Sequence, residues 1–330
     1  MSETRLPLPS RQEIALGIIT VLWGGTYYII QMALKTSGPL FFIGVRFLIA
    51  ALFVICFVGR RHIMKGIPRS EIWRGGLIGV VLAFGYICQT VGLMTITSSR
   101  SAFLTALYVP LVPLLQWIIL RKAPSKSGIA GIFLAFVGLV LLAEPWKTGL
   151  TMSTGDGLTL LGTFSYAFEI ICVGLFALQT DSRRMAFVQL VAGGLFAFCA
   201  MPVMGEHVPP FSWGWLGCAL VMGVVSAATQ LVLNWAQKTV SPTKATIIYS
   251  SEPIWGGLVG WFTGDVLTMT TLVGAGFIVA GVLASEVKPR WPRFRRTLRG
   301  GAVREPLPEQ KRRRRRPSMS DLVIHSAADD

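Results

Sequence analysis

Long apolar stretches separated by short polar connections dominate the chain. A helix needs about 20 mostly apolar residues to cross the hydrocarbon core of a membrane. Ten stretches approach or reach that length, and Pro, Gly and Ser mark the connections between them. They are residues 13–34, 39–59, 73–92, 101–120, 127–144, 156–178, 185–203, 213–236, 244–262 and 268–286. The pattern predicts an all-α integral membrane protein with ten transmembrane helices.

The two halves of the chain repeat each other. Shifted by 143 positions without a gap, the sequence superposes Leu52-Phe53-x-x-Cys56 on Leu195-Phe196-x-x-Cys199, and it also superposes Pro110 on Pro253, Gly131 on Gly274 and Gly138 on Gly281. Each copy holds five predicted helices, and an odd number of crossings forces the second copy to enter the membrane from the opposite side. Such inverted-topology repeats are typical of transporters that bind substrate between the repeats near mid-bilayer.

The repeat divides the chain into four parts. We predict a cytoplasmic N-terminus (1–12), a first five-helix repeat (13–144), a second five-helix repeat (145–287) and a basic tail (288–330). Ser127 and Thr270, at equivalent positions, are expected to cap the fifth helix of each repeat.

Basic residues set the predicted orientation. With the N-terminus inside, the cytoplasmic segments hold 27 of the 31 Lys and Arg residues and the outer segments hold three. Lys and Arg concentrate on the cytoplasmic side of membrane proteins, so both termini are predicted to lie inside. Lys288 to Arg316 contributes 13 of the 27. We expect this segment to be a disordered cytoplasmic tail that attracts anionic lipid, or a solvated tail without a specific partner.

Composition excludes several functional classes. The chain is 52% hydrophobic and 14% charged, against about 25% charged residues in soluble domains. The net charge of +15 belongs largely to the tail, so no nucleic-acid partner is expected. The five cysteines lie inside apolar stretches without CxxC spacing, which predicts neither a metal site nor a disulfide. No ATP-binding P-loop, HExxH or GxSxG motif is present, so no cofactor and no enzymatic activity are predicted.

Three ionisable side chains fall inside predicted spans: Arg46, Glu169 and Glu252. Ionisable residues at membrane depth are costly and mark function by default. Glu169 is equivalent to Thr26 of the first repeat, so its carboxylate breaks the internal symmetry. It is a candidate ligand contact or proton-coupling group. The structural alternative is an ion pair in which Glu169 or Glu252 neutralises Arg46.

Several predicted helices carry aromatic and polar side chains one turn apart, on one face. With Arg46, these residues are expected to line a substrate cavity: Trp23, Tyr27, Gln31, Tyr86, Gln89, Tyr108, Tyr166, Glu169, Gln230, Asn234, Tyr249 and Glu252. Anchoring at the membrane interface is the alternative for the aromatic residues, but the buried polar residues need partners. Pro110 and Pro253 are expected to kink their helices and to shape or gate the cavity.

The order of several short motifs resembles the ten-helix EamA-type branch of the drug/metabolite transporter superfamily over about residues 13–286. The motifs are Trp23-Gly24, Arg46-Phe47, the run from Ser101 to Pro110, and Glu252-Pro253. The resemblance implies a multi-pass secondary carrier of the bacterial inner membrane, often an exporter of amino acids, related metabolites or toxic compounds, that works by alternating access. Glu252-Pro253 recurs in this family, which favours a structural duty for Glu252. Small multidrug members couple protons through a Glu in the first helix, where this chain has Thr26, so Glu169 is the candidate substitute.

The leading hypothesis is therefore a carrier of a small, partly aromatic or zwitterionic metabolite. Arg46 would attract a carboxylate, Glu169 or Glu252 an amine or a proton, and the aromatic faces would stack on the substrate. The alternatives are an integral membrane enzyme acting on lipid-linked substrates, and a scaffold or sensor that signals through the basic tail. Both a monomer and a homodimer are compatible with the glycine-rich helix faces.

Overall fold

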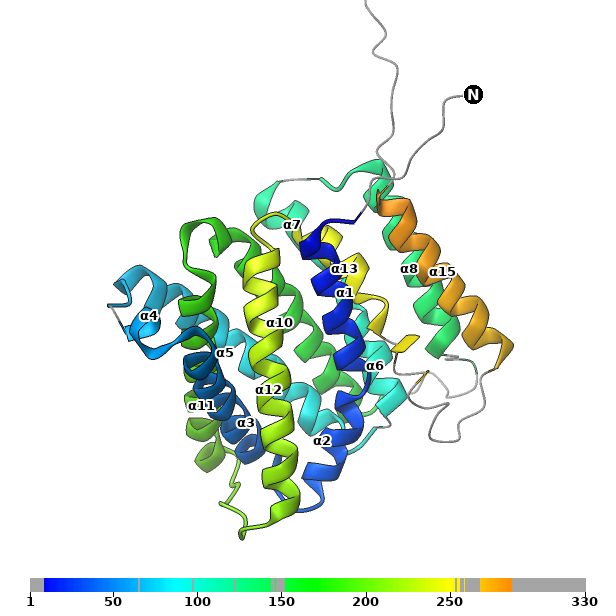
Figure 1. Cartoon of the computed structure of the whole chain (residues 1–330). Coiled ribbons are helices and arrows are strands. Elements are labelled where there is room, and N and C mark those ends of the chain that lie inside the picture. Colours follow the sequence, from blue (N-terminus) through cyan, green and yellow to red (C-terminus); the bar gives the residue numbers. More distant parts are fainter. Residues whose placement is uncertain are drawn as a thin grey trace, which may run out of the picture. The chain divides into compact units, whose positions relative to one another are not determined.

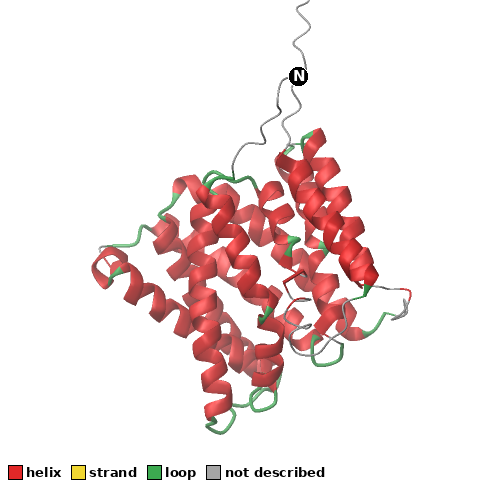
Figure 2. Cartoon of the chain, turned by 45° about the vertical axis from the view of Figure 1, so that its right-hand side comes forward, coloured by secondary structure: helices red, strands yellow, loops and turns green. Residues whose placement is uncertain are grey.

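The structure, a computed structural model, describes residues 9–64, 66–96, 98–121, 123–143, 146, 152–252, 254–255, 258 and 268–286. Throughout these ranges the regular secondary structure is helical, as Figure 2 shows. The predicted all-α fold is thus confirmed for the part of the chain described. The predicted tail (288–330) and Pro253 lie outside the described residues.

Among the described residues, six helical stretches are long and apolar enough to cross a membrane. They are α1 with α2 (Arg11–Gly24 and Thr26–Leu34), α3 (Pro39–Val58), α5 (Arg69–Gly92), α10 with the 3-10 turn η1 (Thr154–Phe176 and Ala177–Gln179), α11 (Ser182–Val203) and α12 (Trp213–Ala236). The other helices are α4 (Arg60–Met64), α6 (Ser98–Ala106), α7 (Tyr108–Leu120), α8 (Lys126–Ala143), α13 (Pro242–Tyr249) and α15 (Met269–Glu286). Of the predicted stretch 244–262, the structure describes only part.

Two predicted helices are interrupted at equivalent places. The fourth stretch breaks at Leu107, between α6 and α7, and α13 ends at Tyr249 with Ser250 as its C-cap. Leu107 and Ser250 are 143 positions apart, so both breaks occupy the same position in their repeats. Pro110 lies three residues beyond the first break, where its missing N–H leaves the Ala106 carbonyl without its helical donor. A third break, at Gly25, divides the first stretch and has no counterpart in the continuous α10.

The predicted caps of α8 and α15 were wrong by two residues. Ser127 does not cap α8, because the Oγ of Ser125 accepts the hydrogen bond from the N–H of Gly128 at 3.0 Å. In the second repeat α15 begins at Met269, and the carbonyl of Thr268 accepts from the N–H of Leu272. Both caps therefore lie two residues before the predicted ones. Ser125 and Thr268 are themselves 143 positions apart, so the repeat extends to the caps.

The pair α8–α15 shows how the halves are related. A Cβ placed on Gly138 would lie 2.6 Å from the carbonyl oxygen of Gly274, and one on Gly281 would lie 2.7 Å from that of Gly131. Gly138 is equivalent to Gly281 in the repeat, and Gly131 is equivalent to Gly274, so the two contacts are the same contact made once by each half. Gly131 faces Gly281 and Gly138 faces Gly274, so the two helices run antiparallel about a local two-fold relation. Glycine permits this close backbone approach, and α8 and α15 lie side by side at one edge of the bundle (Figure 1).

In the rest of the bundle, too, equivalent helices of the two halves each pack on helices of the opposite half. The third helix of the first half, α5, packs on α10 and α11, the first and second helices of the other half. The third helix of the second half, α12, packs correspondingly on α1, α2 and α3. The apolar core is therefore shared between the halves.

Candidate functional site

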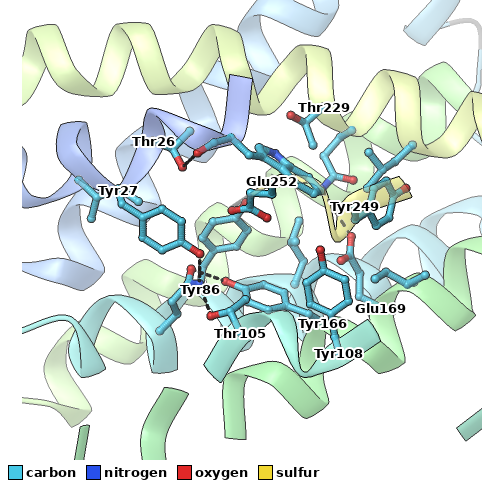
Figure 3. A pocket seen from close by; sticks show the side chains of 17 residues that line it. Thr26, Tyr27, Tyr86, Thr105, Tyr108, Tyr166, Glu169, Thr229, Tyr249 and Glu252 are labelled. Carbon is cyan, nitrogen blue, oxygen red and sulfur yellow. Dashed lines mark hydrogen bonds between the residues drawn. The ribbon is translucent and has the colours of Figure 1, made fainter. Parts of the chain in front are cut away.

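Helices of both halves enclose a cavity. It contains about 630 Å³ of atom-free space, including the space at its mouth. Figure 3 shows its walls, which are formed by Trp23, Thr26, Tyr27, Ile30, Leu82, Tyr86, Gln89, Thr105, Tyr108, Tyr166, Glu169, Ile170, Thr229, Gln230, Leu233, Tyr249 and Glu252. Residues on both sides of all three helix breaks, at Gly25, Leu107 and Ser250, are among them. Broken helices at a central cavity are a recurrent feature of transporter binding sites.

Gln89 of α5 ties four helices together at one wall. Its Nε2 donates to the Oγ1 of Thr105 at 2.8 Å and to the hydroxyl of Tyr27 at 3.3 Å. Its Oε1 accepts from the hydroxyl of Tyr166 at 2.9 Å. The amide is 5% exposed, and both of its N–H groups and one carbonyl lone pair are used. Gln89 therefore positions the tyrosines of the wall more than it offers free groups to a ligand.

Aromatic rings form two clusters around the cavity. Trp23 and Tyr249 have ring centroids 5.3 Å apart in an edge-to-face arrangement, and Tyr108 lies 6.4 Å from Tyr249. On the other side Tyr86 and Tyr166 meet edge-to-face at 5.4 Å. In an edge-to-face pair each ring fixes the position of the other, and a ring face stays available to an apolar or cationic ligand. The walls of the cavity are thus largely aromatic.

Two carboxylates from the second half line the cavity. Glu169 of α10 is 4% exposed, and its Oε1 accepts from the Nε2 of Gln230 at 3.5 Å. Glu252, which follows the break at Ser250, lies next to the hydroxyl of Tyr27. Figure 3 places both carboxylates inside the same ring of tyrosines. No Lys, Arg or His belongs to the described lining, so the cavity has acidic and not basic character.

Arg46 lies behind the cavity wall and does not line it. Its Nε donates to the Oγ of Ser226 at 2.7 Å, and its guanidinium carbon lies 4.6 Å from the ring centroid of Tyr86. The side chain is 3% exposed. Within the described chain no ion pair joins Arg46 to Glu169 or Glu252, so the ion-pair alternative is not what the geometry presents. Arg46 supports Tyr86 from the rear.

The structure brings ten of the thirteen predicted cavity residues to the lining and leaves three elsewhere. Arg46 is one. Gln31 of α2 is half-buried outside the lining, and Asn234 of α12 is buried, with its Nδ2 donating to the Oε1 of Gln189 at 2.6 Å. Pro110 lies in the first turn of α7, near the break. Whether the lining residues bind substrate stays a prediction.

Sequence reasoning did not select several polar residues that matter here. Thr229 lines the cavity and directly precedes Gln230, a neighbour that could have signalled it. Gln189 is equivalent to Arg46 in the repeat and is fully buried, a correspondence visible in the 143-residue shift. Among the described residues no group of His, Cys, Asp and Glu is arranged to hold a metal ion.

Comparison with known proteins shows which family and which solved structure this chain resembles. The profile of the EamA-like transporter family matches residues 12–143 and again residues 153–285. An uncharacterized transporter of Archaeoglobus fulgidus is 27% identical over 274 residues, which cover 82% of this chain and 84% of the relative. The uncharacterized inner membrane transporter YedA of Escherichia coli K12 is 26% identical over 286 residues, covering 82% and 88%. A crystal structure with 14% identity superposes with a TM-score of 0.70 over 84% of this chain and 98% of that one, which shows a shared fold.

Proposed function

Since the chain belongs to the EamA-like transporter family, we propose that it is a secondary carrier that exports a small amine with an aromatic or apolar body by alternating access. The observation that carries this proposal is the cavity between the halves, which has two carboxylates, aromatic walls and no basic side chain in its described lining. A buried carboxylate attracts an ammonium group, and tyrosine or tryptophan faces attract both its charge and its hydrocarbon.

The acidic lining narrows the substrate class. Zwitterionic amino acids and amphiphilic amines both fit the family, but an amino acid brings a carboxylate that needs a cationic partner. Arg46, the candidate partner, is engaged by Ser226 and covered by Tyr86. The proposal therefore ranks amines without a carboxylate above the corresponding amino acids.

The membrane arrangement is part of the same proposal. We propose ten spans with both termini in the cytoplasm of a bacterium, in its inner membrane. The antiparallel α8–α15 pair and the exchanged packing of α5 and α12 support inverted repeats. Impermeant labelling of single cysteines at residues 12 and 145 tests this arrangement, because inverted repeats require the two positions to react from opposite sides.

The transport assignment is tested with the full chain in liposomes. Counterflow of radiolabelled N,N,N-trimethyltryptammonium, a permanently charged amine, is compared with counterflow of tryptophan. We expect the amine to exchange at least tenfold faster, and Glu169→Gln to reduce its exchange at least tenfold. Glu206→Gln is the matched control, because it removes a carboxylate outside the cavity and keeps one of that carboxylate's two hydrogen-bond acceptors. Exchange of neither compound, nor of other aromatic or alkyl amines and amino acids, would count against a carrier of this class.

The basic tail has a separate proposed role. Thirteen Lys and Arg residues between Lys288 and Arg316 suit anionic lipid of the cytoplasmic leaflet, at about 1 kcal/mol for each residue near the surface. Removing residues 289–330 is expected to leave counterflow unchanged and to weaken binding to vesicles that contain phosphatidylserine. Loss of all transport on this deletion would favour the alternative of a tail-dependent sensor.

A further inference from the structure

A row of buried polar side chains runs from the cavity to one end of α12. Gln230, Asn234 and Gln237 are spaced four and three residues apart, so they share one helical face. They are 3%, 2% and 4% exposed. Together with Gln189 of α11, which is fully buried, they are called the α12 polar stripe. The stripe begins at Glu169, which accepts from Gln230, and ends beside Lys238 at the surface of the bundle.

Much of the hydrogen-bonding capacity of this stripe is unmet by protein. The Nδ2 of Asn234 donates to Gln189 and to the carbonyl of Gln230. In the part of the chain described, however, the Oε1 of Gln230, the Nε2 of Gln189 and both polar side-chain atoms of Gln237 have no partner. The hydroxyl of Tyr249, which lines the cavity, lies close enough to Gln237 to interact with it but forms no hydrogen bond of good geometry within the described chain.

Unmet polar atoms at this depth point to water. A polar group transferred to an apolar medium without a partner costs several kcal/mol, and buried waters in proteins bind such groups. One isolated atom would suggest a local defect. Here five such atoms belong to four side chains: Gln230 and Tyr249 line the cavity, Gln237 lies beside Tyr249 at the end of α12, and Gln189 is joined to Gln230 through Asn234. The row therefore has the chemistry of a narrow hydrated path.

The charges around Glu169 suit the passage of protons. Among the described residues, the groups that titrate or carry charge around Glu169 are Tyr86 of α5 with Arg46 of α3 behind it, Tyr166 and Cys172 of α10, Tyr249 of α13, and Glu252. Arg46 is the one cation among them, and Ser226 and Tyr86 hold it outside the stripe. The stripe itself consists of neutral amides, and the ammonium group of Lys238 at its outer end donates to the carbonyl of Thr180 at 3.1 Å. No fixed positive charge therefore lies along the stripe between that end and the carboxylate.

We propose that the α12 polar stripe is a hydrated proton pathway between Glu169 and the end of the bundle that carries Lys238, on the side assigned to the cytoplasm. Water along the unpaired amide groups delivers the proton, so that a hydronium ion and the carboxylate become water and a carboxylic acid, and the reverse step releases it. The inference rests on the proposed carrier function, because a proton pathway serves a carboxylate that changes protonation during transport.

Thiol accessibility tests the hydration without any substrate. Asn234→Cys and Gln237→Cys are made in a variant whose five native cysteines are replaced, and a membrane-impermeant cationic methanethiosulfonate is applied from the tail side. The cysteine thiolate, which forms in water and not in a dry core, attacks the reagent, forms a mixed disulfide with it and displaces methanesulfinate. Ala236→Cys, at the same depth but fully buried among apolar residues, is the matched control. We expect both stripe positions to react at least tenfold faster than Ala236→Cys. Equal rates would overturn the pathway.

Uptake driven by a pH gradient tests whether the stripe conducts protons. Gln237→Leu removes only the contact with the Tyr249 hydroxyl and no hydrogen bond of good geometry in the described chain, so it interrupts the water path with little structural loss. We expect uptake of N,N,N-trimethyltryptammonium driven by a pH gradient to fall at least tenfold, while counterflow without a gradient stays within twofold. Equal losses in both assays, or wild-type uptake that ignores the pH gradient, would overturn the proton assignment. Absent counterflow in the wild type would instead contradict the proposed function, and the thiol rates would still decide the pathway.

Discussion

The hydroxyl of Tyr166 donates a hydrogen bond to the Oε1 of Gln89 at 2.9 Å, and this bond joins the two halves of the protein across the cavity wall. Gln89 belongs to α5 of the first half and Tyr166 to α10 of the second. Because Gln89 also binds Thr105 and Tyr27, the bond couples the relative position of the halves to the shape of the wall.

Loss of the Gln89 side chain should therefore weaken the whole wall. Gln89→Leu leaves three hydroxyl partners without their amide. A side-chain hydrogen bond within a membrane protein contributes about 0.6 kcal/mol on average, so we expect the free energy of unfolding to fall by about 2 kcal/mol. A double-mutant cycle with Tyr166→Phe in detergent measures the central bond directly. A coupling energy indistinguishable from zero would show that the contact does not hold the halves together.

Arg46 should act through Tyr86 and not through a substrate carboxylate. Arg46→Lys loses the Nε–Ser226 hydrogen bond and the planar contact under the Tyr86 ring, two properties that lysine does not reproduce. We expect counterflow of the amine and of tryptophan to fall by the same factor, about fivefold to tenfold for about 1 kcal/mol of lost support. A variant that loses tryptophan exchange alone would show instead that Arg46 binds the carboxylate.

The glycine contacts of α8 and α15 should respond symmetrically. An added Cβ on Gly138 or Gly281 meets a backbone carbonyl of the opposite helix at 2.6 or 2.7 Å, so one of the helices must move. We expect Gly138→Ala and Gly281→Ala each to lower the free energy of unfolding by about 1–3 kcal/mol, the usual range for overpacking. Gly276→Ala, where a Cβ meets no atom within 4 Å, is the control and should be neutral or slightly stabilising. Unequal penalties for the first two would contradict the two-fold relation.

Glu206 should stabilise the start of α3. Its two carboxylate oxygens accept from the backbone N–H of Leu40 at 3.0 Å and of Phe41 at 2.7 Å. Glu206→Ala removes this cap and a negative charge at a helix N-terminus, an expected loss of about 1–2 kcal/mol. Gly38→Ala places a Cβ where the carboxylate lies, so it should cost about the same. Thermal unfolding of the two single variants and the double variant checks this. Additive losses would show that Gly38 acts independently of the cap.

The one-dimensional pattern of the chain determined the class of protein and much of its internal symmetry. The lengths of the apolar stretches predict membrane helices because hydrocarbon thickness sets the number of residues needed. The 143-residue shift, with Gly131 and Gly138 against Gly274 and Gly281, anticipated which helix surfaces meet. Aromatic and polar residues one turn apart, such as Tyr166 with Glu169, identified faces that the folded chain brings to one cavity. Each of these signals is local or follows from comparing the chain with itself.

Only the tertiary structure decided how deep each polar side chain lies. Helical spacing gives the direction of Arg46 but not the presence of Tyr86 between it and the cavity, which depends on how α5 packs beside α3. Helical spacing likewise did not reveal that Asn234 donates to Gln189 of α11. It also did not reveal that Glu206 caps a helix whose Leu40 lies 166 positions away in the chain. Such contacts arise from the register between distant helices. That register is set by the summed packing of many side chains, and no single stretch of sequence contains it.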